Sequence, residues 1–244
     1  MEPPIYARHG IDARYIGHPL ADALPLEPDR AAARDALGLP HDVPVLAVLP
    51  GSRLGEIHRL GRTFLDAAAL LARTIPNLHV VVPAANAQCR AALEALHPDV
   101  PNLRLIDGDA QRAMIASDAV LLASGTAALE AMLCKRPMVV GYRIAPSTHA
   151  IVKGLGLLKV DRYALPNVLA GDTIAPELMQ DDCTPEKLAA ALSPYLHSSD
   201  AGAVLHRTFR DLHLALRRDA SVRAAEAIAE LLVEHTSSLP APLA

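Results

Sequence analysis

Two short runs of small and polar residues in this sequence have the composition of anion-binding turns. Residues 51–53 are Gly-Ser-Arg and follow the apolar run Val45–Leu49, and residues 124–126 are Ser-Gly-Thr and follow the apolar run Ala119–Ala123. Glycine lets the backbone approach a ligand closely, hydroxyl groups donate hydrogen bonds, and an arginine offers paired donors that match phosphate oxygens. Each run fits the phosphates of a nucleotide, and each taken alone fits an ordinary turn equally well.

The segments around both turns predict how these residues are positioned. Short, wholly apolar runs are typical of strands that are covered on both faces, and each turn is followed by helix-forming sequence. After the first turn the apolar residues recur at helical spacing, at Ile57, Leu60, Phe64, Ala68 and Leu71. In a parallel sheet such turns lie together at the carboxyl edge, where helix N-termini attract anions. We therefore expect the two turns to bind one anionic ligand between them.

The order of apolar runs predicts an α/β fold, a doubly wound Rossmann-like parallel sheet with C-terminal helices. Strands are expected at residues 45–49, 78–82, 103–106, 119–123 and 137–140, with helices between them. Beyond Arg143 the strand signal fades. There we expect a helix over 146–158, a turn at 165–167, a helix over 185–195 that Thr184 caps, and two closing helices.

Composition narrows the class of protein. Hydrophobic residues make up 51% of the 244 residues and charged ones 20%, so the chain can bury a core, although it has no Trp and only two Phe. The net charge of −4 comes without a basic block, which argues against nucleic acid as the main partner. Cys89, Cys134 and Cys183 form no CxxC pair, which indicates reduced thiols in the cytosol.

No apolar run is long enough to predict a membrane span or a signal peptide. The most apolar stretch, residues 151–160, is interrupted by Lys153 and Lys159. A core helix with lysines reaching solvent is favoured there over a helix lying in a membrane interface.

The remaining candidate residues are weaker signals. Glu130 lies one turn into the helix that follows the second candidate turn, where it fits either a ribose contact or a solvated surface position. Asp107 and Asp109 have the spacing of a pair that holds a divalent ion, but a turn in which Asp109 caps the next helix is favoured. His18 and His149 are near candidate loops without an identifiable acidic partner. We therefore expect no metal site and no cofactor.

Several motifs together resemble lipid-A-disaccharide synthase, in the same order and at similar spacing. They are Leu49-Pro-Gly-Ser-Arg53, Ala123-Ser-Gly-Thr-Ala-Ala-Leu-Glu130, Pro137-Met-Val-Val-Gly-Tyr-Arg143 and Leu165-Pro-Asn-Val-Leu-Ala-Gly171, flanked by Ile16-Gly-His-Pro-Leu-Ala-Asp22 and Pro185-Glu-Lys-Leu-Ala-Ala-Ala191. The resemblance covers nearly the whole chain, and the combination is much more specific than any single motif.

This resemblance implies one half of a GT-B glycosyltransferase, whose two Rossmann-like domains face each other across a cleft. The family transfers 2,3-diacylglucosamine from UDP to 2,3-diacylglucosamine 1-phosphate, with inversion and without a metal, in lipid A and lipopolysaccharide biosynthesis. It implies catalytic roles for Arg53 and Asn167. The residues expected to bind the UDP-sugar are Gly51, Ser52, Arg53, Ser124, Gly125, Thr126, Glu130, Gly141, Tyr142, Arg143 and Asn167.

The resemblance is confined to the C-terminal, donor-binding half. Residues 1–20 are expected to be a remnant of the N-terminal acceptor domain, with a short strand near 13–17, and 21–28 a linker. Residues 29–200 would form the UDP-sugar-binding domain, 201–238 the C-terminal helices and 239–244 a tail. We expect the chain alone to be inactive.

The implied partners are UDP-2,3-diacylglucosamine and, through the missing half, a lipid acceptor, with no nucleic acid. The full enzyme would be cytoplasmic, peripheral to the inner membrane, and compatible with a homodimer. Two alternatives stay open at this point: a non-catalytic UDP-sugar-binding module, and a related enzyme such as a UDP-N-acetylglucosamine epimerase.

Overall fold

The computed structural model describes residues 3–97, 99–144, 162–197 and 199–237, and its centre is a six-stranded parallel sheet. Its strands are β1 (Val45–Leu49), β2 (His79–Ala84), β3 (Leu103–Asp107), β4 (Ala119–Ala123), β5 (Met138–Tyr142) and β6 (Glu177–Met179). The strand order is β3-β2-β1-β4-β5-β6, with every neighbouring pair parallel. This order reverses direction between β1 and β4, and ligands bind at such a switch point in open α/β sheets.

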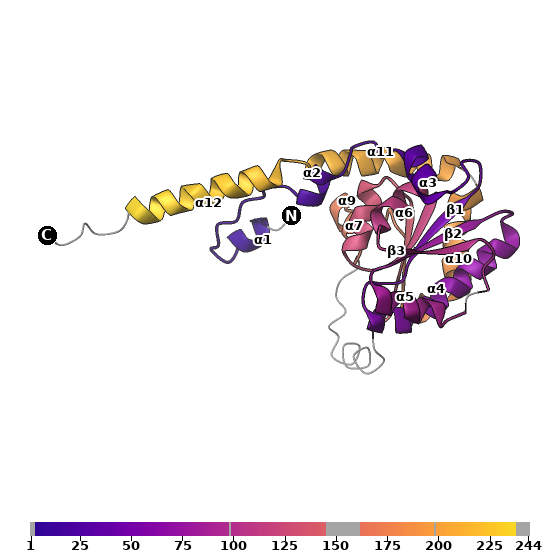
Figure 1. Ribbon diagram of the computed structural model, residues 1–244. Coiled ribbons are helices and arrows are strands. Elements are labelled where there is room, and N and C mark those ends of the chain that lie inside the picture. Colours follow the sequence, from indigo (N-terminus) through magenta and orange to yellow (C-terminus); the bar gives the residue numbers. More distant parts are fainter. Residues whose placement is uncertain (1–2, 98, 145–161, 198, 238–244) are drawn as a thin grey trace. The chain divides into compact units, whose positions relative to one another are not determined.

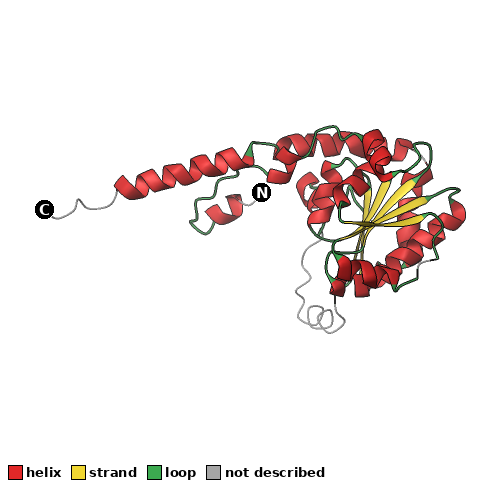
Figure 2. Cartoon of the chain, viewed as in Figure 1, coloured by secondary structure: helices red, strands yellow, loops and turns green. Residues whose placement is uncertain are grey.

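Helices cover both faces of the sheet (Figures 1 and 2). One layer contains α4 (Leu54–Thr74), α5 (Ala87–Glu94) and α10 (Pro185–His197). The other contains α3 (Arg30–Leu37), α6 (Ala110–Ala116) and α7 (Thr126–Leu133), with α9 (Leu165–Ala170) packed against α7. Because both faces are covered, every residue of β1 and β4 is buried, which explains their wholly apolar sequences.

The doubly wound sheet and its first five strands are confirmed within one to two residues at each end. The sixth strand was not predicted, because β6 is only three half-buried residues long and contains a glutamate. The turn expected at residues 165–167 is wrong, since α9 begins there. The strand expected near 13–17 is also wrong, because residues 11–18 form neither helix nor strand. The helix expected over 146–158, and His149 within it, lie outside the described residues.

Gly141 in β5 is required by close packing. A Cβ atom at this position would lie 2.6 Å from Cε1 of Phe64, a fully buried side chain of α4. We therefore predict that Gly141→Ala lowers the free energy of unfolding by about 1–3 kcal/mol, the usual cost of overpacking a core.

Urea denaturation would test this prediction, with Gly55→Ala as the matched control. A Cβ at Gly55 meets only the mobile end of the Arg59 side chain, at 3.3 Å, so this helix substitution should be neutral or slightly stabilising. Equal stability of the two variants would show that Phe64 adjusts without cost.

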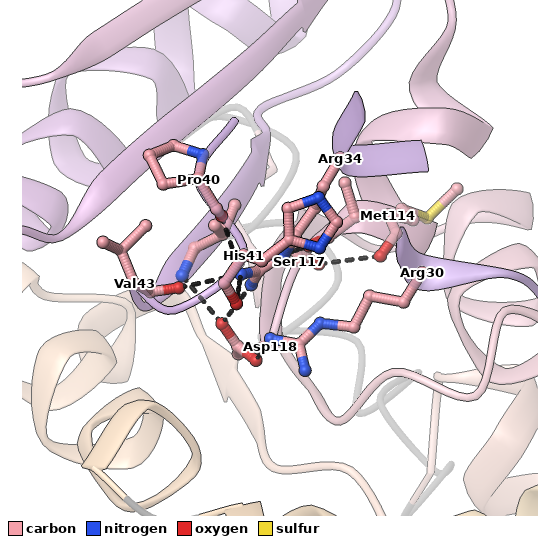
Figure 3. A network of polar contacts seen from close by, with 10 residues as sticks. Arg30, Arg34, Pro40, His41, Val43, Met114, Ser117 and Asp118 are labelled. Carbon is pink, nitrogen blue, oxygen red and sulfur yellow. Dashed lines mark hydrogen bonds and ion pairs between the residues drawn. The ribbon is translucent and has the colours of Figure 1, made fainter. Parts of the chain in front are cut away.

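A buried ion pair ties α3 to the start of β4 (Figure 3). The Arg34 side chain is 1% exposed, and its Nη2 donates to Oδ2 of Asp118 at 2.9 Å. The same carboxylate accepts from Arg30 and from the backbone N–H of Val45 at 2.8 Å. Arg34 also donates to backbone carbonyls, including those of His41 and Ala116 at 2.7 and 2.9 Å. One guanidinium therefore holds α3, α6 and the start of the sheet together.

Contacts divide the chain into two compact units, Glu27–Arg210 and a second formed by Met1–Leu26 with Asp211–Ala244. The second unit contains α1 (Pro3–Ala7), α2 (Pro19–Ala23) and α12 (Ala220–Ser237), and α11 (Ser199–Leu216) has residues in both. Within it, the Asp22 carboxylate accepts from the backbone N–H groups of Ala220, Asp219 and Arg218, at 2.6, 3.0 and 3.0 Å. These bonds lower the pKa of Asp22 and fix the start of α12.

Candidate functional site

A pocket of about 350 Å³ lies at the carboxyl edge of the sheet, at the ends of β1, β2, β3 and β4. Its size is in the range typical of small-ligand sites. Seven of the residues that the sequence predicts for the site line it: Gly51, Ser52, Arg53, Ser124, Gly125, Thr126 and Glu130. The two candidate turns, more than 70 residues apart in sequence, therefore face one cavity, as the parallel-sheet argument predicts.

The turn between β4 and α7 has an open helix N-terminus. Gly125 has φ 150° and ψ −157°, a conformation available almost only to glycine, and no side chain caps the helix at this residue. The exposed Thr126 begins α7, so the first backbone N–H groups of the helix are directed toward the pocket. This turn can bind an anion without displacing any part of the protein.

The turn between β1 and α4 is different, because a carboxylate already occupies its N–H groups. Oε2 of Glu56 accepts from the backbone N–H of Ser52 at 2.9 Å and of Arg53 at 3.2 Å. A Cβ at Gly51 would lie 2.4 Å from Cβ of Glu56, so glycine is needed for this close approach. The two turns are therefore not equivalent anion sites, and α7 provides the stronger one.

The first turn still contributes an exposed cation. The Arg53 side chain is 84% exposed and its Nη1 lies 3.6 Å from Oε1 of Glu56, a distance that leaves it free to reach a ligand. Across the pocket, Glu130 is half-buried on α7, and this burial raises the pKa of its carboxyl group. A carboxyl group in this position can accept hydrogen bonds from a ligand hydroxyl.

The predicted residues of β5 lie beside the pocket and do not line it. Gly141 pairs with Ala123, so the end of β5 is next to the Ser124 turn. Gly141 itself packs against Phe64, and the Arg143 guanidinium donates to Thr63 Oγ1 at 3.1 Å and to the backbone carbonyl of Cys183. Tyr142 is half-buried and is the last residue of β5.

Asn167 is not brought to the pocket. Its side chain is fully buried on α9, where Nδ2 donates to Ala175 O at 2.8 Å and to Glu177 Oε1 at 2.7 Å. Its Oδ1 accepts from the backbone N–H groups of Ile174 and Ala175 at 2.9 and 2.8 Å. The amide is therefore fully engaged in holding α9 against β6, and this geometry does not support a catalytic role.

The two aspartates at the end of β3 form ion pairs with different arginines. Asp107 binds Arg90 at 2.9 Å and Asp109 binds Arg112 at 2.8 Å. Asp109 does precede α6, but with φ 52° and without a side-chain capping bond. Within the described ranges, no three His, Cys, Asp or Glu side chains gather as metal ligands.

Sequence reasoning missed the pocket wall contributed by β2 and β3. It includes Pro83, Ala85 and Gly108. None of these residues has a functional group that points to a binding site, but their positions at strand ends place them at this edge. Glu56 was missed as well. Its position at the third residue of α4 is the available signal, because a glutamate there commonly accepts from backbone N–H groups at the helix start.

Solved structures share this doubly wound, Rossmann-like architecture, which is the fold expected for one half of a GT-B glycosyltransferase. Sucrose-phosphate synthase from Thermosynechococcus elongatus aligns with a TM-score of 0.59 and 15% identity, over 95% of this chain and 56% of that one. A putative UDP-N-acetylglucosamine 2-epimerase from Listeria monocytogenes aligns with a TM-score of 0.55 and 14% identity, over 90% and 53%. At such low identity these similarities establish the fold alone.

Sequence comparison identifies the family. The family model for lipid-A-disaccharide synthetase matches residues 1–231, so this chain belongs to that family. The lipid-A-disaccharide synthase of Xanthomonas axonopodis pv. citri is 59% identical over 243 residues, which cover 98% of this chain and 55% of that protein. The chain thus spans about half the length of the curated relatives it matches and corresponds to a C-terminal half. None of the helices in the described part combines the length and apolar character of a membrane span.

Proposed function

We propose that this chain is the donor-binding half of a lipid-A-disaccharide synthase and that UDP binds in the pocket between β1 and β4. The observation that carries the proposal is the joint lining of one cavity by the open N-terminus of α7, Arg53 and Glu130. A helix N-terminus and a guanidinium suit a diphosphate, and a carboxyl group suits ribose hydroxyls. Membership of the synthase family favours glycosyl transfer over the reaction of an epimerase.

In the proposed reaction, 2,3-diacylglucosamine passes from UDP to 2,3-diacylglucosamine 1-phosphate in lipid A biosynthesis. The acceptor hydroxyl oxygen bonds to the anomeric carbon as the bond from that carbon to the β-phosphate oxygen breaks. A base takes the hydroxyl proton, and UDP leaves with the bonding electrons. Negative charge therefore grows on the diphosphate, where the α7 N-terminus and Arg53 stabilise it.

The uracil end of the donor is assigned from the layout of the sheet. The uracil side is assigned to the end of β5, at the backbone of Gly141 and Arg143 and the side chain of Tyr142, because β5 lies next to β4. The full enzyme works in the cytoplasm, peripheral to the inner membrane, and its other half binds the lipid acceptor. The donor is UDP-2,3-diacylglucosamine.

We predict that UDP binds more tightly than UMP and that Arg53→Ala weakens UDP binding by about 1.5–3 kcal/mol, the usual worth of a charge-assisted hydrogen bond. Titration calorimetry of UDP and UMP with both proteins measures this difference. Arg62→Ala is the matched control, since Arg62 pairs with Asp66 on the exposed side of α4 and does not line the pocket. Equal UDP affinity in the wild type and Arg53→Ala would remove Arg53 from the site.

A further inference from the structure

A second pocket, of about 330 Å³, lies at the opposite edge of the sheet, where the strands begin. Asp118 directly precedes β4 in this region, and Arg136 lies two residues before β5. The pocket is lined by the side chains of Arg30, Lys135 and Arg136, together with Asp118, Tyr195 and His206. Since β4 has five residues and such a strand spans roughly 17 Å, this basic pocket is separate from the proposed UDP site.

The first of the two carboxylates near the basic pocket is already shared. Asp118 accepts from both Arg30 and Arg34 and also from the backbone N–H of Val45, as described above (Figure 3). Two guanidinium groups thus share one negative charge. Among the described residues, Arg136 forms no salt bridge with a carboxylate.

The second carboxylate, Glu27, is shared as well. Its Oε1 lies 3.1 Å from Nε of Arg210 and its Oε2 lies 3.2 Å from Nε2 of His206. Among the described residues around the pocket, the cations Arg30, Arg136 and Arg210 therefore share the carboxylates Asp118 and Glu27 with the neighbouring Arg34 and His206. This local excess of positive charge occurs in a chain whose net charge is −4.

Two donors at the basic pocket lack an acceptor. Nε of Arg30 and Nε of Arg136 are buried, and neither has a hydrogen-bond partner in the described part of the chain. A buried donor without a partner is destabilising, and more so when it belongs to a charged group. Burial also lowers the pKa of Arg136 to about 10 and that of Lys135 to about 8, because the charged forms are poorly solvated.

We propose that the basic pocket binds a phosphate group, as free phosphate or as a small phosphate monoester. Guanidinium groups bind phosphate oxygens through planar, paired donors, and a phosphate accepts several hydrogen bonds at once. Such an anion accepts from the guanidinium groups of Arg30 and Arg136, which line the pocket, and offsets the excess positive charge. The proposal does not depend on UDP binding at the other edge of the sheet.

Calorimetric titration with inorganic phosphate and with glucose 1-phosphate, at constant ionic strength, tests this site. The parent protein is the full chain carrying Arg53→Ala, in which anion binding at the UDP pocket is weakened from the start. Adding Arg136→Gln should weaken binding of the anion by about tenfold or more, whereas adding Arg62→Gln should not change it. Binding of either ligand with this pattern supports the proposal, and phosphate alone would restrict the pocket to the free anion.

A thermal-denaturation series distinguishes a variant that has lost the phosphate site from a variant that does not fold. Phosphate should raise the melting temperature of the parent, and Lys135→Gln, a milder change at the same pocket, should reduce that rise. The proposal is overturned if neither anion binds the parent. It is also overturned if Arg136→Gln and Lys135→Gln variants that fold as the parent does bind phosphate equally well.

Discussion

Asp118→Ala is expected to lower the free energy of unfolding by about 3–5 kcal/mol, the typical cost of removing one partner from a buried ion pair. The substitution leaves the guanidinium of Arg34, which is 1% exposed, without its counter-charge. It also removes the acceptor of the Val45 N–H at the start of β1. Urea denaturation followed by circular dichroism measures the loss.

Asp66→Ala is the control for this prediction. Asp66 also pairs with an arginine, Arg62, but the two side chains are 41% and 67% exposed. Exposed pairs contribute about 0–1 kcal/mol, so the control should remain close to the wild type. A loss below 1 kcal/mol for Asp118→Ala would mean that the backbone carbonyls around Arg34 hold it without the carboxylate.

The second large effect is expected in catalysis: the purified 244-residue chain should bind UDP and yet transfer no sugar. An inverting transfer needs a base on the acceptor hydroxyl and an acceptor held in line with the anomeric carbon. The carboxylates of the UDP pocket are assigned elsewhere, since Glu56 caps α4, Asp109 pairs with Arg112 and Glu130 lies at the proposed ribose position. We therefore assign base and acceptor binding to the other half of the family's longer chain.

An assay of UDP release from both acylated glucosamine substrates in detergent tests this division of roles. The chain is measured alone and together with a separately expressed N-terminal half of a relative. Turnover only in the mixture supports the proposal and argues against a purely non-catalytic module. Turnover by this chain alone that disappears in Asp109→Asn or His149→Ala would place the base within these 244 residues.

Local sequence was sufficient to predict five of the six strands and the edge of the sheet at which the two turns meet. The runs 45–49 and 119–123 are wholly apolar because helices cover both faces of β1 and β4. An uninterrupted apolar run therefore predicts a strand that is buried on both faces. Since the carboxyl ends of parallel strands share one edge, the turns at Gly51 and Ser124 could be expected in one pocket. No long-range contact had to be known for this inference.

Features that depend on distant residues could not be predicted. Leu165-Pro166-Asn167 suggests a turn, but Asn167 binds Ile174, Ala175 and Glu177. These contacts favour a helix that ends at Ala170 and is capped by Gly171. The pairing of Arg34 with Asp118 joins positions 84 residues apart. The difference between the two anion-binding turns depends on one rotamer of Glu56, which spacing alone does not fix.

A crystal structure of this chain with UDP tests the central claim most directly. We predict the diphosphate at the N-terminus of α7, accepting from the backbone N–H of Thr126, with the Arg53 guanidinium closed over it and the ribose beside Glu130. UDP bound with its diphosphate between Arg30 and Arg136, or a pocket at Ser124 without ligand at saturating UDP, would contradict the proposed donor site.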